Sequence, residues 1–145
     1  MTVVIASDHA GTELKEFLKG RISVHGHQVV DMGTNDGSSV DYPDFASLVA
    51  KAVSSGKFDI GVLICGTGIG MSIAANKIPG IRAALCTNEF MAAMARKHNN
   101  ANVIALGARI LDRETAGKIL DIFMSTEFEG GRHATRLEKI TRMEG

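Results

Sequence analysis

The feature that most constrains the fold of this chain is a regular alternation of short apolar runs with segments of helical periodicity. Five runs are rich in Val, Ile and Leu, as expected for strands buried on both faces, and cover residues 3–6, 28–32, 60–65, 82–86 and 102–106. Between them apolar residues recur every three or four positions, as from Phe45 to Val53 and from Ala116 to Met124. This alternation predicts a three-layer, Rossmann-like α/β fold with a five-stranded parallel sheet.

Local signals mark where some of the helices begin and end. Gly26 is placed to end the first helix, Pro43 suits a first helical turn, and Asp112 is a candidate N-cap. With 145 residues and no repeat or linker, the chain is expected to form a single domain over residues 1–145. After Gly130-Gly131, an appended helix over about 134–143 carries only a thin apolar stripe, so residues 130–145 are expected to pack on a partner subunit.

Composition excludes several classes of protein. The 16 basic and 16 acidic side chains cancel, whereas binding to nucleic acid or to a membrane surface usually requires an uneven balance, so we expect neither partner. No apolar stretch approaches the roughly 20 residues that span a bilayer, and the first residues lack a signal-peptide pattern. Cys65 and Cys86 form neither a disulfide framework nor a zinc motif, so the sequence predicts a cytoplasmic protein.

Reactive side chains follow the predicted strands. In an open parallel sheet, ligands bind beyond the carboxyl ends of the strands. Asp8 and His9 follow the first strand, Tyr42 lies beyond the second, and Arg109 follows the fifth. We therefore expect a site at this edge of the sheet.

The strongest local motif follows the third strand and reads Cys65-Gly66-Thr67-Gly68-Ile69-Gly70. Alternating glycines let successive backbone N–H groups turn toward a ligand, and the helix expected next adds its dipole, so the turn suits a phosphate or an enediolate oxygen. It lacks the spacing of dinucleotide-binding and Walker loops, which disfavours a plain nucleotide site. Cys65 is either a thiol with a usable thiolate fraction or a buried strand-end cysteine, and spacing alone leaves both open.

Other candidates also have two readings. His98 ends a helix, where the dipole favours a histidine, or it is a general acid–base that opens a sugar ring. Asp8 and His9 are an N-cap with a solvated histidine, or a substrate clamp. Arg132 and Arg136 share a helical face that is solvated or grips a phosphate, with Arg109 able to join them. No cluster of histidines and carboxylates has metal-ligand spacing, so we expect no metal.

These residues together resemble ribose-5-phosphate isomerase B, in a family that also contains the galactose-6-phosphate isomerase subunits. The resemblance runs nearly end to end in order and spacing. It is carried by the segments 3–11, 41–43, 63–68, 74–77, 96–99 and 130–133.

The resemblance implies an aldose–ketose isomerase of the pentose phosphate pathway that interconverts D-ribose 5-phosphate and D-ribulose 5-phosphate through a cis-enediolate, without metal or cofactor. It implies that Cys65 is the base, that Thr67 helps form the anion hole and that His98 opens the ring. The further implied groups are Gly66, Gly68 and Gly70 for the anion hole, Asp8, Tyr42 and Asn99 for the sugar, and His9, Arg109, Arg132 and Arg136 for the phosphate. One branch of the family carries its base as Glu at the position of Met71, so this chain looks like the cysteine type.

The family also implies a homodimer, possible pairing into tetramers, and sites shared between subunits. Two rival hypotheses remain: an isomerase of a hexose 6-phosphate, and a non-catalytic phosphometabolite-binding module. Cys65, Thr67, His98 and the arginines all occur in one chain, which favours a homo-oligomer over a heteromeric hexose-phosphate enzyme.

Overall fold

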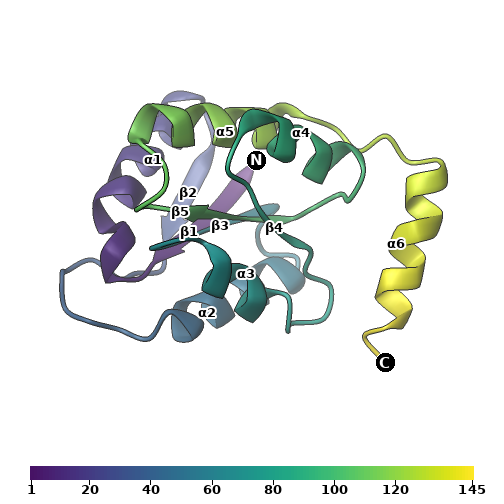
Figure 1. Cartoon of the computed structure of the whole chain (residues 1–145), viewed down its shortest axis with the longest axis horizontal. Helices are drawn as coiled ribbons and strands as arrows, with labels where there is room; N and C mark the ends of the chain where they lie inside the picture. The colour runs from purple at the N-terminus through teal and green to yellow at the C-terminus, as the bar shows by residue number, and fades with distance from the viewer.

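The computed structural model describes residues 1–145 and contains one five-stranded, all-parallel sheet in the order β2-β1-β3-β5-β4 (Figure 1). The strands are β1 (Thr2–Ser7), β2 (Gln28–Asp31), β3 (Ile60–Cys65), β4 (Ala83–Leu85) and β5 (Val103–Gly107). The chain runs outward from β1 to β2 and then returns to β3 on the other side of β1, so the order reverses between β1 and β3. Such a reversal opens a crevice at the carboxyl ends of the two strands.

Helices cover both faces of the sheet, as the alternation predicts (Figure 1). The short 3-10 helix η1 (His9–Gly11) leads into α1 (Thr12–Val24), which shares one face with α4 (Glu89–Lys97) and α5 (Arg113–Ser125). The other face is covered by α2 (Tyr42–Ser54) and α3 (Ile69–Ala75). This confirms the predicted three-layer α/β fold, and Asp112 caps α5 by accepting the Thr115 N–H at 2.8 Å.

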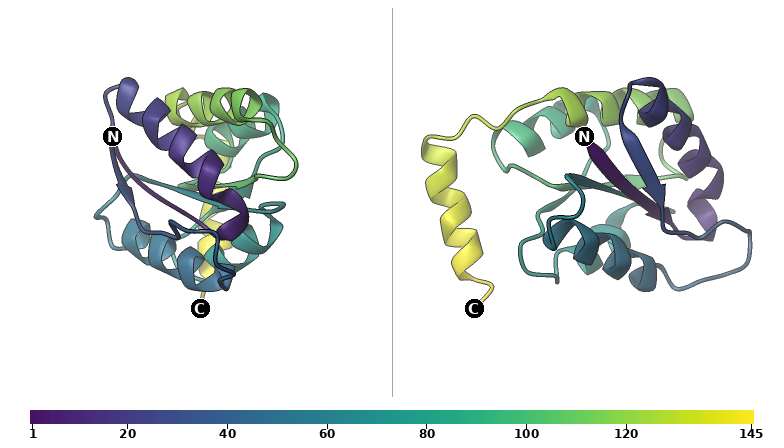
Figure 2. Two further views of the ribbon diagram at one scale, coloured as in Figure 1. Left: turned by 90° about the vertical axis from the view of Figure 1, so that its left-hand side faces the viewer. Right: turned by 180° about the vertical axis from the view of Figure 1, so that it is seen from behind.

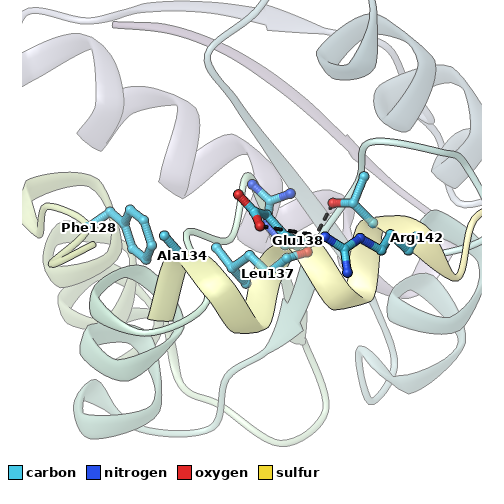
Figure 3. Close-up of a pocket in the computed structure, with 7 residues that line it drawn as sticks. Phe128, Ala134, Leu137, Glu138 and Arg142 are labelled. Carbon is cyan, nitrogen blue, oxygen red and sulfur yellow. Dashed lines mark hydrogen bonds and ion pairs between the residues drawn. The ribbon is translucent and has the colours of Figure 1, made fainter. Parts of the chain in front are cut away.

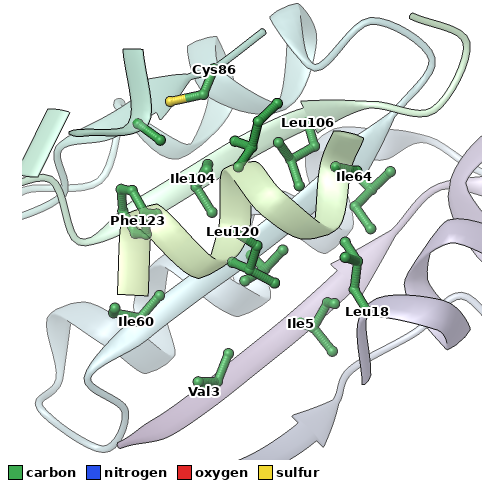
Figure 4. Packing of buried hydrophobic residues seen from close by; sticks show 14 of the residues in the cluster. Val3, Ile5, Leu18, Ile60, Ile64, Cys86, Ile104, Leu106, Leu120 and Phe123 are labelled. Carbon is green, nitrogen blue, oxygen red and sulfur yellow. The ribbon is translucent and has the colours of Figure 1, made fainter. Parts of the chain in front are cut away.

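The core has two halves because successive side chains of a strand point to opposite faces. Val3 and Ile5 of β1 pack on the α1–α5 side, and Val4 and Ala6 pack on the α2–α3 side. In the first half, Leu120 of α5 lies against the β3 and β5 side chains (Figure 4). The three central strands are buried at every residue except Thr2, at the start of β1, and this burial fixes the positions of their carboxyl ends.

The two edge strands depart from the expected burial on both faces. In β2 exposed and partly buried positions alternate, with Val30 45% exposed, and every residue of β4 is only partly buried. Both strands lie at the ends of the sheet order, where one side has no neighbouring strand. The predicted fourth strand was also too long, because Arg82 and Cys86 lie outside β4.

The last helix, α6 (Arg132–Arg142), begins two residues earlier than predicted and stands beside the sheet-and-helix body (Figures 1 and 2). Leu137 is buried, but Ile140 is 44% and Met143 83% exposed. A groove of about 420 Å³ runs along α6, with Phe128 and Leu137 among its lining residues (Figure 3). None of the helices combines the length and apolar character needed to cross a bilayer.

A buried lysine holds the segment after β2. The Lys15 side chain, on α1, has no exposed surface, and its Nζ donates to Asp31 Oδ1 at 2.8 Å, to the Thr34 carbonyl at 2.5 Å and to Asn35 Oδ1 at 2.7 Å. All three ammonium donors are therefore satisfied. Burial opposes ionisation of Asp31, yet hydrogen bonds from Lys15 and Lys19 lower the pKa of this carboxyl below its usual value.

Replacing Lys15 should destabilise the fold far more than replacing Lys19. Lys15→Met leaves the partly buried carboxylate of Asp31 and the oxygens of Thr34 and Asn35 without their donor, and we expect urea unfolding to show a loss of about 3 kcal/mol. Lys19 also bonds Asp31, at 2.9 Å, but its side chain is 27% exposed, so Lys19→Met should cost less than about 1 kcal/mol. The difference between wild type and Lys15→Met should shrink below about pH 4, as Asp31 becomes protonated. Equal losses in the two variants would contradict this role of Lys15.

Candidate active site

The glycine-rich turn after β3 folds back over the Cys65 thiol. Cys65 is only 5% exposed, and its Sγ accepts the N–H of Gly68 at 3.2 Å. Gly68 has a φ of +83°, and a Cβ there would lie 2.6 Å from Leu85 Cδ1 and 3.0 Å from a backbone atom of Leu106. The turn therefore requires glycine at this position, both for its left-handed backbone and for its close contact with β4 and β5.

Backbone donors of this turn remain open toward solvent or a ligand. The N–H groups of Gly66 and Thr67 donate to no acceptor within the chain, while Thr67 Oγ1 accepts the N–H of Ile69 at 3.2 Å as α3 begins. Two adjacent free N–H groups beside a sulfur form an anion-binding concavity. This arrangement suits an oxyanion that develops next to the thiol.

Arg109 and Tyr42 flank the turn on two sides. The backbone N–H of Arg109 donates to the Gly66 carbonyl at 2.9 Å, and a Cβ on Gly66 would lie 3.2 Å from Arg109 Nη1, so the guanidinium lies over this glycine. Tyr42, in the first turn of α2, lies so close to Gly70 that a Cβ there would be 2.6 Å from the ring. The structure thus brings the predicted residues of three strand ends together.

Asp8 and His9 lie at the neighbouring strand end. Ser7 of β1 pairs with Ile64 of β3, so Asp8 and Cys65 leave adjacent strands that are about 4.8 Å apart. Asp8 caps η1 through Oδ1, which accepts the Ala10 N–H at 3.0 Å. His9 Nδ1 accepts the Val40 N–H at 3.3 Å, so the neutral ring carries its proton on Nε2.

His98 and Asn99 lie at the opposite edge of the sheet. They follow the last turn of α4 and come shortly before β5. The carbonyl of Asn102, the residue that precedes β5, accepts the Gly61 N–H at 2.9 Å at the amino end of β3. The six residues of β3 span roughly 17 Å, so within one chain His98 is far from Cys65. The position of His98 before a strand, instead of after one, is the sequence signal that indicates this separation.

The arginines of α6 lie near His98, not near Arg109. Arg132 and Arg136 are both exposed on α6, and His133 of the same helix stacks on His98 with ring centroids 4.1 Å apart and planes 15° from parallel. Within one chain Arg109 therefore does not join the other two arginines, and their common grip on a phosphate stays a prediction. Arg109 belongs to the Cys65 edge, because β5 ends there.

Sequence reasoning missed two members of the group around His98. Nε2 of His98 and Nε2 of His133 each lie 3.7 Å from Glu129 Oε1, and the His133 side chain is only 9% exposed. Burial, followed by the charges of His98 and Arg132, lowers the pKa of His133, so its ring is neutral at neutral pH. Glu129 and His133 flank the Gly130-Gly131 break, and only the folded chain brings them to His98.

These three residues place possible metal donors within 4.8 Å of one another. Two nearly parallel rings do not aim their nitrogen lone pairs at one point, and metal ligation requires that they do. Positive charge from Arg132 and Arg136 also acts on His133. The group is therefore better suited to sharing a proton with Glu129 than to holding a divalent cation.

Gly68→Ala should destabilise the fold, because the alanine would have to adopt a left-handed backbone and contact Leu85. We expect a loss of about 2–3 kcal/mol in urea unfolding. Gly20→Ala is the matched control: a Cβ at Gly20, in the interior of α1, meets no atom within 4 Å, so this variant should gain about 0.5–1 kcal/mol. A Gly68→Ala protein as stable as wild type would contradict the assigned strain.

Comparisons with known proteins agree with this geometry. The sequence profile of the Ribose/Galactose Isomerase family matches residues 3–140. Ribose-5-phosphate isomerase B of Escherichia coli (strain K12) is 44% identical over 142 residues, covering 98% of this chain and 95% of the relative. Among solved structures, ribose-5-phosphate isomerase B of Clostridium thermocellum superposes with a TM-score of 0.98 at 53% identity, covering 99% of this chain and 97% of that one.

A second structure adds a ligand to the comparison. Ribose-5-phosphate isomerase B of Mycoplasma genitalium with bound ribulose-5-phosphate superposes with a TM-score of 0.96 at 46% identity, covering 99% of this chain and 95% of that one. These matches extend over the glycine-rich turn, the His98 segment and α6 alike. The chain therefore belongs to the ribose/galactose isomerase family.

Proposed function

We propose that this protein interconverts D-ribose 5-phosphate and D-ribulose 5-phosphate, as an enzyme of the pentose phosphate pathway. The observation that carries the proposal is the Cys65 sulfur held beside the free N–H groups of Gly66 and Thr67. Aldose–ketose isomerisation needs a base, a site for a developing oxyanion and a grip on the phosphate. The structure of the Mycoplasma genitalium relative contains bound ribulose-5-phosphate, which is one of the two sugar phosphates in this reaction.

Proton transfer is assigned to the carboxyl edge of the sheet. Cys65 Sγ, as the thiolate, takes the proton from C2 of the open-chain aldose and returns it to C1, while a proton moves between the two substrate oxygens. The negative charge of the enediolate falls on oxygens that face the Gly66 and Thr67 N–H groups, where fixed donors stabilise it. Asp8 and Tyr42, which border the same crevice, are assigned to the sugar.

Ring opening is assigned to His98. Ribose 5-phosphate is mainly a closed furanose, so its hemiacetal C1–O bond must break before C2 can lose a proton. His98 supplies a proton to the ring oxygen and removes one from the C1 hydroxyl, and Asn99 binds a neighbouring hydroxyl. Ribulose 5-phosphate cannot form a furanose, because its O5 is esterified, so only the aldose requires this step.

The separation of His98 from Cys65 implies that one site is built by two chains. We infer a homodimer in which the Cys65 edge of one subunit faces the His98 edge and α6 of the other, so that Arg132 and Arg136 reach the phosphate with Arg109 and His9. The exposed apolar side chains and groove along α6 support a partner at this helix. Dimers can pair further into tetramers, and the two free cysteines suit the reducing cytoplasm, where we place the protein.

Cys65→Ala should abolish proton transfer. With ribulose 5-phosphate in D2O, NMR should show deuterium uptake at C1 for wild type, and the variant should lose about 10³-fold or more in this rate while still binding the sugar phosphate by calorimetry. Cys86→Ala is the matched control, because Cys86 faces the other half of the core and burial raises the pKa of its thiol to about 11. Near-normal exchange by Cys65→Ala would overturn the assignment of the base.

Mixing two inactive variants should restore activity if sites are shared. Cys65→Ala removes the base at the carboxyl edge of the sheet. The double variant Arg132→Ala/Arg136→Ala removes the two arginines of α6, near the opposite edge, and both of these side chains are exposed. After joint refolding at equal amounts, about half of the dimers are mixed, and each contains one intact site, so about one quarter of wild-type turnover should return. A site contained in one chain predicts no recovery, and that result would defeat the two-chain arrangement.

A further inference from the structure

Arg96 lies where the segment carrying His98 meets the segment carrying Glu129. It belongs to the last turn of α4, one residue before the helix ends at Lys97 and the loop 98–101 begins, and its guanidinium stands 5.6 Å from the centroid of the Phe123 ring of α5. The side chain is partly buried between α4 and α5. Packing against α5 therefore restricts the Arg96 side chain, in addition to the hydrogen bonds that it makes.

On one side the guanidinium holds the His98 loop. Arg96 Nη1 donates to Asn100 Oδ1 at 3.3 Å and also to the carbonyl of Ala101. Asn100 has a φ of +44°, a left-handed backbone that costs free energy in a residue other than glycine. The loop is thus held in an unfavourable conformation from outside, immediately after His98 and Asn99.

On the other side the guanidinium holds the segment that leads to α6. Arg96 Nε donates to the Thr126 carbonyl at 3.2 Å, and three residues later the Glu129 N–H donates to the Lys97 carbonyl at 3.1 Å. Glu129 is the carboxylate that faces both His98 and His133. One side chain thus connects the two segments whose alignment brings the imidazole pair and its carboxylate together.

This use of an arginine has a cost. The hydrogen-bond partners of Arg96 are three neutral oxygens, and burial together with the positive charge of Arg82 lowers the pKa of its guanidinium. Arg82 in turn donates to the carbonyls of Asn99 and Asn100 at 2.9–3.2 Å. Two cations that repel each other thus converge on one short loop, whose oxygens accept hydrogen bonds from both.

We propose that Arg96 is a positioning residue for ring opening, which acts by setting His98 against Glu129 and His133. The inference rests on the proposed function, in which His98 opens the furanose. It assigns no contact between Arg96 and the substrate. Its consequence is that loss of Arg96 impairs the use of the closed aldose and leaves proton transfer at Cys65 intact.

The test compares two reactions of the same variant, Arg96→Lys, whose single ammonium cannot span the three acceptors. Conversion of ribose 5-phosphate should fall between about 10- and 100-fold, whereas deuterium uptake at C1 of ribulose 5-phosphate, which needs no ring, should stay within about 2-fold of wild type. Retained exchange also shows that the variant is folded. As the concentration of Arg96→Lys is raised, the rate of ribose 5-phosphate conversion should reach a ceiling. At that point spontaneous opening of the furanose limits the supply of the open-chain aldehyde.

Two further proteins make the result specific. The double variant Arg96→Lys/His98→Ala should convert ribose 5-phosphate no more slowly than His98→Ala, because a residue that acts through His98 adds no further loss once His98 is absent. Arg21→Lys is the matched control, because Arg21 of α1 is another partly buried arginine, bound to Asp121 of α5 at 2.6–3.1 Å. In this variant, ribose 5-phosphate conversion and deuterium exchange at C1 of ribulose 5-phosphate should both stay near the wild-type rates.

Three outcomes overturn the inference. The first is a parallel fall of conversion and exchange in Arg96→Lys, which indicates general disruption of the fold. The second is full conversion in Arg96→Lys, and the third is an additive loss in the double variant. Failure of the proposed function is recognised separately, because the wild-type chain would then neither exchange the C1 proton nor convert ribose 5-phosphate.

Discussion

The hydrogen bond from the Asp8 N–H to the Ile64 carbonyl, at 3.0 Å, extends the parallel pairing of β1 and β3 by one residue past the strand end. This pairing holds Asp8 beside Cys65, and the other features of the carboxyl edge depend on it. The pairing of β3 with β5 also continues past the strand ends: the N–H groups of Ala108 and Arg109 donate to the carbonyls of Cys65 and Gly66, each at 2.9 Å. The turn that covers the thiol is therefore held by main-chain bonds, which give a reacting group a fixed frame.

Parallel pairing also separates the functional groups. Because all five strands point the same way, each helix between them must carry the chain back to the amino edge. A residue at the end of such a helix, like His98, lies a strand length away from a residue at the end of a strand, like Cys65. A second subunit is the simple way to bring the two edges together. The α6 helix leaves apolar side chains such as Ile140 exposed, which a second subunit could bury.

One buried and one partly buried cation hold the loops at the two edges of the sheet. Lys15 fixes the segment after β2, which reaches His9 through the Val40 N–H, and Arg96 fixes the loop after α4. In both cases backbone carbonyls and side-chain amides accept the bonds. Burying a cation is unfavourable unless its donors find acceptors, so these hydrogen bonds favour one conformation of each loop.

Sequence periodicity determined the order and type of the elements, the buried central strands and the N-cap of α5, because these depend on neighbours within a few residues. The resemblance named the residues that are predicted to carry the chemistry, including Cys65 and the α6 arginines. Only the tertiary structure placed Arg109 and Tyr42 against the glycine turn, grouped Glu129 and His133 with His98, and set that group at the edge opposite Cys65. The contacts follow from strand order and chain direction, which join residues far apart in the sequence; the local pattern indicates which edge of the sheet a residue lies at, but not which residues touch there.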